Sequence, residues 1–242
     1  MKRFIVFILI SFVVIGSNAQ NAYQKIIYQA YLNGDMSTWA SVIYTIERDN
    51  PATLNKKLEL LSYIYGYTGY LIGHKKKEDA KIYIGKAKEL IKSVLVKWPE
   101  NPTVYAFKGA FIGFEIGLNH LKSISLAPES SAAIDKCLQL DSKNIQGIID
   151  KANIFYHTPA LFGGDKQKSL ELYQKAAKLI ETQQQADFNW LYLNLLTTIA
   201  QNYEALGELQ SAHSLYERLL RMEPRFKWVR DKLLPRLEAR MG

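Results

Sequence analysis

The side chains best suited to chemistry in this chain of 242 residues are four histidines and one cysteine. They are His74, His120, His157, His213 and Cys137. The histidines are scattered, and no two of them have the spacing of a zinc-binding helix. A cysteine nucleophile needs an adjacent base, and none is visible beside Cys137. We therefore expect a non-enzymatic protein with no catalytic residue, no metal site and no cofactor.

The run Gly163-Gly164-Asp165 has two interpretations. Its backbone amides and the start of the next helix could face an anion. A small-molecule pocket would then include Tyr156, His157, Phe162, Gly163, Gly164 and Asp165. Alternatively, the glycines allow a tight connection and Asp165 caps the helix that follows. We favour the second interpretation because it accounts for all three residues. A phosphate loop is not expected, since the Lys-Ser or Lys-Thr ending is missing.

Two groups of side chains could bind a partner. Polar residues recur on one helical face at Asn194, Thr197, Gln201 and Glu204, while apolar neighbours supply the core. Solvent exposure alone would also explain such a polar face. Aromatic residues gather between positions 63 and 70, where Tyr65 points away from the face shared by the other three tyrosines. Tyr65 and the polar series are therefore our candidate partner-binding residues.

The formal net charge is +8, which raises the question of nucleic acid. The densest basic run, Lys75-Lys76-Lys77, is followed at once by Glu78-Asp79. This run is typical of a solvated turn between helices, and the other basic residues do not form a stripe. We expect no nucleic-acid partner.

The first residues have the pattern of a secretory signal. Met1-Lys2-Arg3 is positive, Phe4 to Ile15 is almost continuously apolar, and Ser17-Asn18-Ala19 supplies small residues before Gln20. The apolar run is shorter than the roughly 20 residues of a membrane-spanning helix. We expect cleavage after residue 19, export to the periplasm or cell envelope, and a mature chain without a transmembrane segment. Loss of Lys2 and Arg3 lowers the net charge from +8 to +6.

The remaining sequence is helical throughout. Apolar residues recur at helical spacing, and no segment alternates as a half-buried strand does. Turns rich in Gly, Pro, Asn and Asp separate the helices. We expect an all-α fold with helices near 21–32, 36–48, 53–72, 77–97, 102–119, 129–140, 145–157, 166–182, 187–206, 209–222 and 225–240.

One helix pair carries the pattern of a known repeat. Its key positions are Leu193, Leu196, Ile199, Ala200, Tyr203, Gly207, Ala212, Tyr216 and Pro224. At these offsets the segment 190–224 resembles a tetratricopeptide repeat. The resemblance implies helix-pair repeats stacked in a right-handed superhelix, in a single domain of residues 20–242, with a capping helix at 225–240. It also implies that the polar series faces the concave side.

Two narrower resemblances concern function. The runs Tyr63 to Gly66, Ala106 to Phe114 and Pro159 to Lys166 resemble exported tetratricopeptide proteins typical of the Bacteroidetes. The run Pro159 to Asp165 is also similar to one in tetratricopeptide proteins associated with TRAP-type transporters. We expect a binding or scaffolding module of the cell envelope that holds a protein or peptide on its concave face. The alternative is a periplasmic accessory of a transporter that binds a small molecule in a pocket among the repeats.

Processing gives the first testable prediction. The mature protein should begin at Gln20, because a signal peptidase would cut after the small residues Ser17 to Ala19. Mass spectrometry of the protein purified from its native cells measures this directly. An exported protein that retains Met1 or Lys2 would contradict it.

Overall fold

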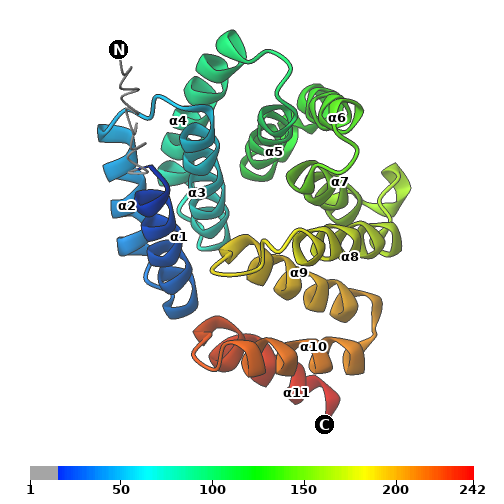
Figure 1. The fold of residues 1–242 in the computed structure, drawn as a ribbon. Helices are drawn as coiled ribbons and strands as arrows, with labels where there is room; N and C mark the ends of the chain where they lie inside the picture. Colours follow the sequence, from blue (N-terminus) through cyan, green and yellow to red (C-terminus); the bar gives the residue numbers. More distant parts are fainter. Residues whose placement is uncertain (1–15) are drawn as a thin grey trace, which may run out of the picture.

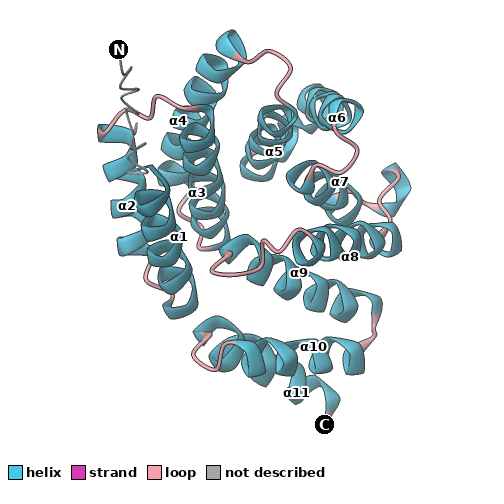
Figure 2. Cartoon of the chain, in the orientation of Figure 1, coloured by secondary structure: helices cyan, strands magenta, loops and turns pink. Residues whose placement is uncertain are grey.

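The computed structural model describes residues 16–242, and no strand occurs in that range. The all-α prediction is confirmed there (Figures 1 and 2). The helices are α1 (Gly16–Asn33), α2 (Met36–Arg48), α3 (Leu54–Gly73), α4 (Lys77–Lys97), α5 (Pro102–Leu118), α6 (Ser123–Leu140), α7 (Ile145–His157), α8 (Lys166–Thr182), α9 (Trp190–Leu206), α10 (Leu209–Met222) and α11 (Leu234–Met241). Residues 1–15, which hold most of the predicted signal, lie outside the described residues.

Local sequence fixes most helix starts. The side chains of Asp35, Thr53 and Asn101 each accept a hydrogen bond from the backbone N–H three residues later. Asn144 and Asn189 do the same for α7 and α9. Each cap satisfies one of the N–H groups that a helix start leaves unpaired. These caps explain why the predicted starts were accurate to within a few residues at most of these turns.

The helices pack as consecutive pairs that form a right-handed superhelix. Each helix contacts the next along the chain, and α5 also contacts α3 and α7. In Figure 1, α3, α5, α7 and α9 surround the middle of the molecule, and α2 and α6 lie further out. We call the side of α3, α5, α7 and α9 that faces this middle the inner face.

Three segments differ most from the predicted ranges. Helix α1 begins at Gly16, before the predicted start at 21. Helix α6 begins at Ser123 and not near 129, because Pro128 does not stop it. The hydrogen bond that Pro128 cannot donate leaves the Ile124 carbonyl unpaired, and Ile124 is 90% exposed to solvent. The last helix is interrupted by a π-helical turn, η3 (Val229–Leu233). A widened turn fits here because the ring of Pro235 would clash with the carbonyl of Asp231 in a regular helix.

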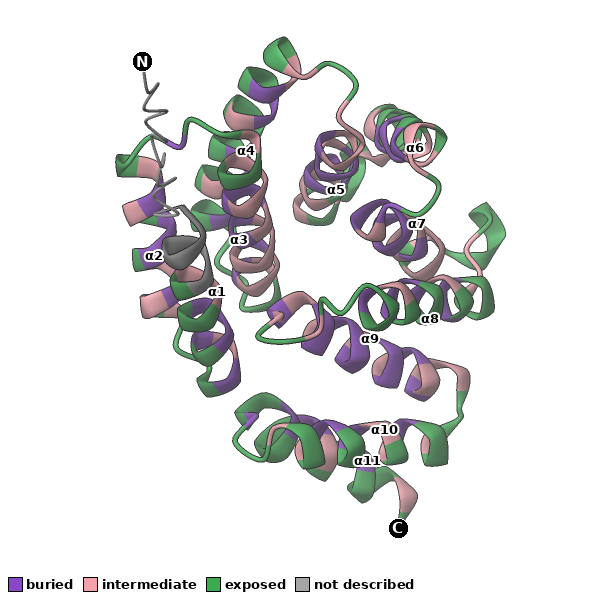
Figure 3. Cartoon of the chain, in the orientation of Figure 1, coloured by how far each residue is buried: buried purple, intermediate pink, exposed green. Residues whose placement is uncertain are grey.

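The two ends of the superhelix share their cores. One apolar cluster is built mainly from α7 to α11 but includes Tyr28 and Leu32 of α1. The other is built mainly from α1 to α5 but includes Trp190 of α9. Figure 3 shows buried residues along most of α9, the helix that both clusters use. The superhelix is therefore closed by contact between α1 and α9.

Two indole rings form the centre of this closure. The rings of Trp39 and Trp190 meet edge to face, with their centroids 5.0 Å apart. Trp39 Nε1 donates to the Tyr63 carbonyl at 3.0 Å, which satisfies its only polar group. Both indoles lie against Gly66 of α3, where a Cβ atom would come within 2.7 Å of each ring. Only glycine leaves room for the pair.

Gly66→Ala tests this packing. The added methyl group should force the two indoles apart and lower the free energy of unfolding by about 1 to 3 kcal/mol. The matched control is Gly85→Ala in α4, where an added Cβ meets nothing within 4 Å. It should raise stability by about 0.5 to 1 kcal/mol, because alanine favours a helix interior. Urea denaturation measures both, and equal stabilisation by the two substitutions would contradict the close approach.

Candidate functional site

A polar cluster joins α3, α7 and α8. Asp150 Oδ2 accepts a hydrogen bond from Gln146 Nε2 at 2.9 Å. Asp150 Oδ1 accepts from Asn153 Nδ2 at 3.2 Å and from Tyr65 Oη at 3.4 Å. The Tyr173 hydroxyl donates to Asn153 Oδ1 at 2.6 Å. We call Tyr65, Gln146, Asp150, Asn153 and Tyr173 the inner cluster.

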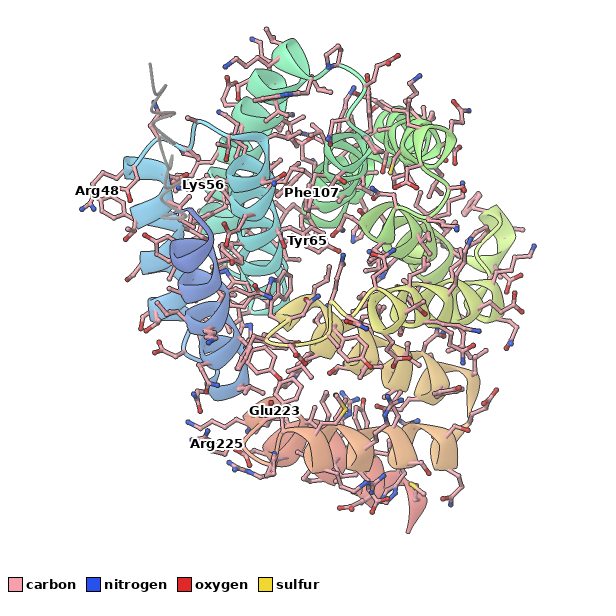
Figure 4. The ribbon with its side chains drawn as sticks, in the orientation of Figure 1. Arg48, Lys56, Tyr65, Phe107, Glu223 and Arg225 are labelled. Carbon is pink, nitrogen blue, oxygen red and sulfur yellow. The ribbon has the colours of Figure 1, made fainter. Side chains whose placement is uncertain are left out.

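Aromatic rings hold Tyr65 in position. Its ring stacks on Phe114 with centroids 5.2 Å apart, and the ring centroids of Phe107 and Phe111 on the same helix lie within 6.4 Å. Figure 4 shows Tyr65 and Phe107 reaching from α3 and α5 toward the middle of the molecule. Tyr65 and Asn153 are half-buried, so the inner cluster has side chains at the surface of the inner face.

The inner cluster contains a buried carboxylate without a cationic partner. Asp150 is 1% exposed, and no Lys, Arg or His nitrogen of the described residues lies within 4.0 Å of it. Burial raises the pKa of Asp150 to about 7, against the lowering effect of its hydrogen bonds from Gln146, Asn153 and Tyr65. Burial also raises the pKa of Tyr65 well above its ordinary value, so this phenol stays a donor. The arrangement can accept a further hydrogen bond or a cation.

The predicted polar series on α9 is largely engaged within the chain. Asn194 Oδ1 accepts a hydrogen bond from Tyr31 of α1 at 3.0 Å. Thr197 is fully buried, and its hydroxyl donates to the Leu193 carbonyl. Gln201 is half-buried. The partner-binding role of this series stays a prediction, but the series is not the freely solvated face that its spacing indicated.

Glu204 has a structural partner set. It is 8% exposed and accepts from Tyr216 at 2.7 Å and from Arg236 at 2.9 Å, and it also pairs with Arg240. These contacts hold α11 on α9. The sequence did not predict these contacts, because the two arginines lie more than 30 residues further along the chain. Nothing in the sequence distinguishes them from the other basic residues of the same segment.

The run Gly163-Gly164-Asp165 is a turn with a helix cap, as the favoured interpretation predicted. Gly163 has φ +90°, and a Cβ on Gly164 would overlap the Thr158 carbonyl. Asp165 accepts from the Lys168 N–H at 3.0 Å, and its own N–H donates to the Phe155 carbonyl. Asp165 therefore caps α8.

The residues of the alternative pocket lie around this turn. The rings of Tyr156 and His157 are in contact, with centroids 4.9 Å apart. Phe162 is 75% exposed, and its neighbour Leu161 is 88% exposed. These two apolar side chains point into solvent.

Sequence reasoning also missed most of the inner cluster. Gln146, Asp150 and Asn153 recur at helical spacing within α7, whose buried side is otherwise apolar. Three polar residues on the buried stripe of a helix are a usable signal, because buried polar groups need partners. Tyr65 of α3, which donates to Asp150, was among the predicted residues. It was chosen only because it points away from the other tyrosines of its helix.

Comparison with known proteins identifies the fold. No family model matches the chain, and no curated protein matches it. A solved structure, that of TTC0263, a thermophilic TPR protein in Thermus thermophilus, is similar with a TM-score of 0.54 at 13% sequence identity. The match covers 91% of this chain and 97% of that one. The chain thus has the fold of stacked tetratricopeptide-type helix pairs.

The described residues contain no helix that could span a membrane and no group of side chains that could hold a metal ion. Within residues 16–242, no helix is both long and apolar enough to cross a membrane. In the same part of the chain, no group of three or more His, Cys, Asp or Glu side chains is placed to hold a metal ion.

The buried Asp150 gives a prediction about pH. Because its pKa in the folded chain is about 7 and its ordinary value is 3.8, the folded state holds this proton more tightly than the unfolded state. Its contribution to stability should fall as the pH rises from about 4 to about 7, and Asp150→Asn should remove that slope. Urea denaturation at several pH values measures the difference between the two proteins.

The control is Asp79→Asn, which changes an exposed carboxylate in the first turn of α4. It should keep the wild-type slope over the same pH range. If Asp150→Asn and Asp79→Asn have the same slope, Asp150 is not the group that titrates in this window.

Proposed function

We propose that this chain is a non-enzymatic binding module that holds a protein or peptide partner on its concave inner face. Stacked helix pairs of this type commonly mediate protein–protein interaction and offer an extended concave surface. The proposal includes export: after removal of residues 1–19 the module would act in the periplasm or cell envelope. The signal pattern of the sequence supports this location.

The observation that carries the proposal is the buried carboxylate of the inner cluster. Burying a carboxylate without a cation is unfavourable, and an apolar residue at position 150 would fill the same space at lower cost. Strongly shifted groups of this kind gather at functional sites. Tyr65 and Asn153 are half-buried and donate hydrogen bonds to Asp150. A partner segment with a hydrogen-bond donor or a basic side chain would bind beside these two residues and stabilise the charge of Asp150.

In this proposal, the predicted series on α9 would extend this surface. Asn194 and Gln201 are half-buried on α9. They would contact the partner along α9, while Thr197 and Glu204 would keep the helix and its cap in place. The partner would therefore lie across α3, α7 and α9.

The small-molecule alternative has less support. Its pocket would need Phe162 to line a cavity, but this side chain is mostly exposed. Asp165 already serves as a helix cap. No specific contact in the described residues therefore supports a role as an accessory of a transporter.

Tyr65→Phe tests the proposal. The substitution keeps the ring against Phe114 and removes only the hydroxyl that reaches Asp150 and Asn153. The partner co-purified from the native envelope should bind about tenfold more weakly, which corresponds to about 1.4 kcal/mol. The control is Tyr70→Phe, which changes another half-buried tyrosine of α3 that packs against His74. It should bind like the wild type.

Site-specific cross-linking shows which face the partner uses. A photoreactive residue at Asn153 on the inner face should capture the partner, and one at Tyr44 on α2, a position 63% exposed, should not. Capture from Tyr44 alone, together with unchanged affinity of Tyr65→Phe, would place the partner elsewhere and overturn the proposal.

A further inference from the structure

A groove of about 470 Å³ lies between α4, α5 and α6. Its apolar lining consists of Ile91, Leu95, Val96, Ile112 and Leu126. Its charged lining consists of Lys88, Lys92, Lys108, Glu115 and Glu129. None of these residues belongs to the inner cluster or to the contacts that close the superhelix.

The groove opens on the other side of α5 from the inner face. Ile112 lines the groove, whereas Phe114, two residues later, stacks on Tyr65. Two residues correspond to about 200° of rotation around a helix. A partner on the inner face would therefore leave the groove free.

The groove has an apolar floor and an exposed apolar edge. Ile91 and Ile112 are buried in the floor, and Leu95 and Leu126 are half-buried on its two sides. Val96 is 82% exposed at the edge. An apolar side chain docked here would remove Val96 and the two flanking leucines from water.

The rim carries an excess of positive charge. Lys88 pairs with Glu115 at 2.9 Å, and Lys108 pairs with Glu129 at 3.2 Å. Lys92 follows Lys88 by one turn of α4. Among the described residues, no carboxylate lies within the 4.0 Å of a salt bridge to Lys92. This lysine is available to an acidic group on a ligand.

The dimensions of the groove suit a helix. Its lining on α4 runs from Lys88 to Val96, which is about 12 Å, or two helical turns. Helices α4 and α6 flank it, so an added helix could place apolar side chains at i, i+4 and i+7 along the floor. A small molecule fits less well, because the polar lining consists of exposed or half-buried lysine and glutamate, and none of these groups is deeply buried to orient it.

We propose that this groove is a second binding site, which takes an amphipathic acidic helix of another protein. Apolar side chains of that helix contact Leu95, Val96 and Leu126, and an acidic side chain pairs with Lys92. Together with a partner on the inner face, the groove makes the chain a bridge between two proteins. The groove proposal stands on its own residues and does not depend on the inner cluster.

Synthetic peptides test the proposal with the full mature chain. The first peptide has about four helical turns, with apolar residues at i, i+4, i+7 and i+11 and glutamates beside them. The second has the same composition in scrambled order, and the third has lysine in place of each glutamate. Fluorescence anisotropy should show binding of the first peptide only.

Substitutions then locate the bound peptide. Lys92→Glu and Val96→Glu should each weaken binding of the first peptide by about tenfold or more. The control is Ile82→Glu, since Ile82 is 57% exposed on the same helix but outside the groove. It should leave binding unchanged, and circular dichroism should show the same helix content in all three variants.

Several outcomes overturn the groove proposal. They are equal binding of the ordered and scrambled peptides, equal binding of the lysine peptide, or loss of binding in Ile82→Glu as large as in Val96→Glu. Self-association of the chain that Val96→Glu abolishes would make a second copy the occupant and would also overturn it. Tyr65→Phe should leave peptide binding intact, so the two proposed sites can fail separately.

Discussion

The contact between Trp39 and Trp190 over Gly66 is the constraint on which the rest of the structure depends. A stack of helix pairs normally touches only its neighbours along the chain, and its ends are free. Here α1 and α9 are joined by the hydrogen bond from Tyr31 to Asn194, and α2 and α9 by the edge-to-face indole pair. Through this closure, one apolar cluster includes Tyr28 and Leu32 of α1, and the other includes Trp190 of α9.

The stacking of the helix pairs also builds the inner cluster. Tyr65 of α3 reaches Asp150 of α7 because the superhelix brings these helices to opposite sides of α5. Burial of Asp150 raises its pKa and strengthens each of its hydrogen bonds. The groove between α4, α5 and α6 differs from the inner cluster, because its floor is apolar and its charged side chains lie at the rim.

Local patterns predicted the helices well but predicted the contacts between them poorly. The ranges 36–48, 77–97, 145–157, 166–182 and 209–222 agree with the structure, since caps and apolar spacing act within a few residues. Asp165 was identified as a cap on the same grounds. The range 129–140 began too late, because α6 includes Pro128 and starts at Ser123.

The contacts of the candidate site join residues that lie far apart in the sequence, and a local sequence pattern cannot predict such contacts. Glu204 was expected to face a partner, yet its ligands Arg236 and Arg240 come from the cap more than 30 residues later. Asp150 was not predicted because its companions Tyr65 and Tyr173 lie on other helices. Periodicity shows which side of a helix is polar, but the arrangement of the whole stack decides what that side meets.

The closure has a further effect on the order in which the chain folds. Of the described helices, α1 is synthesised first, but Asn194 and Glu223, which accept hydrogen bonds from Tyr31 and Tyr28, lie 163 and 195 residues further on. Most other contacts are local, and local contacts form quickly. The amino-terminal pair is thus the first to be synthesised and the last to find its full set of neighbours. Its native packing requires synthesis of the chain at least as far as Glu223.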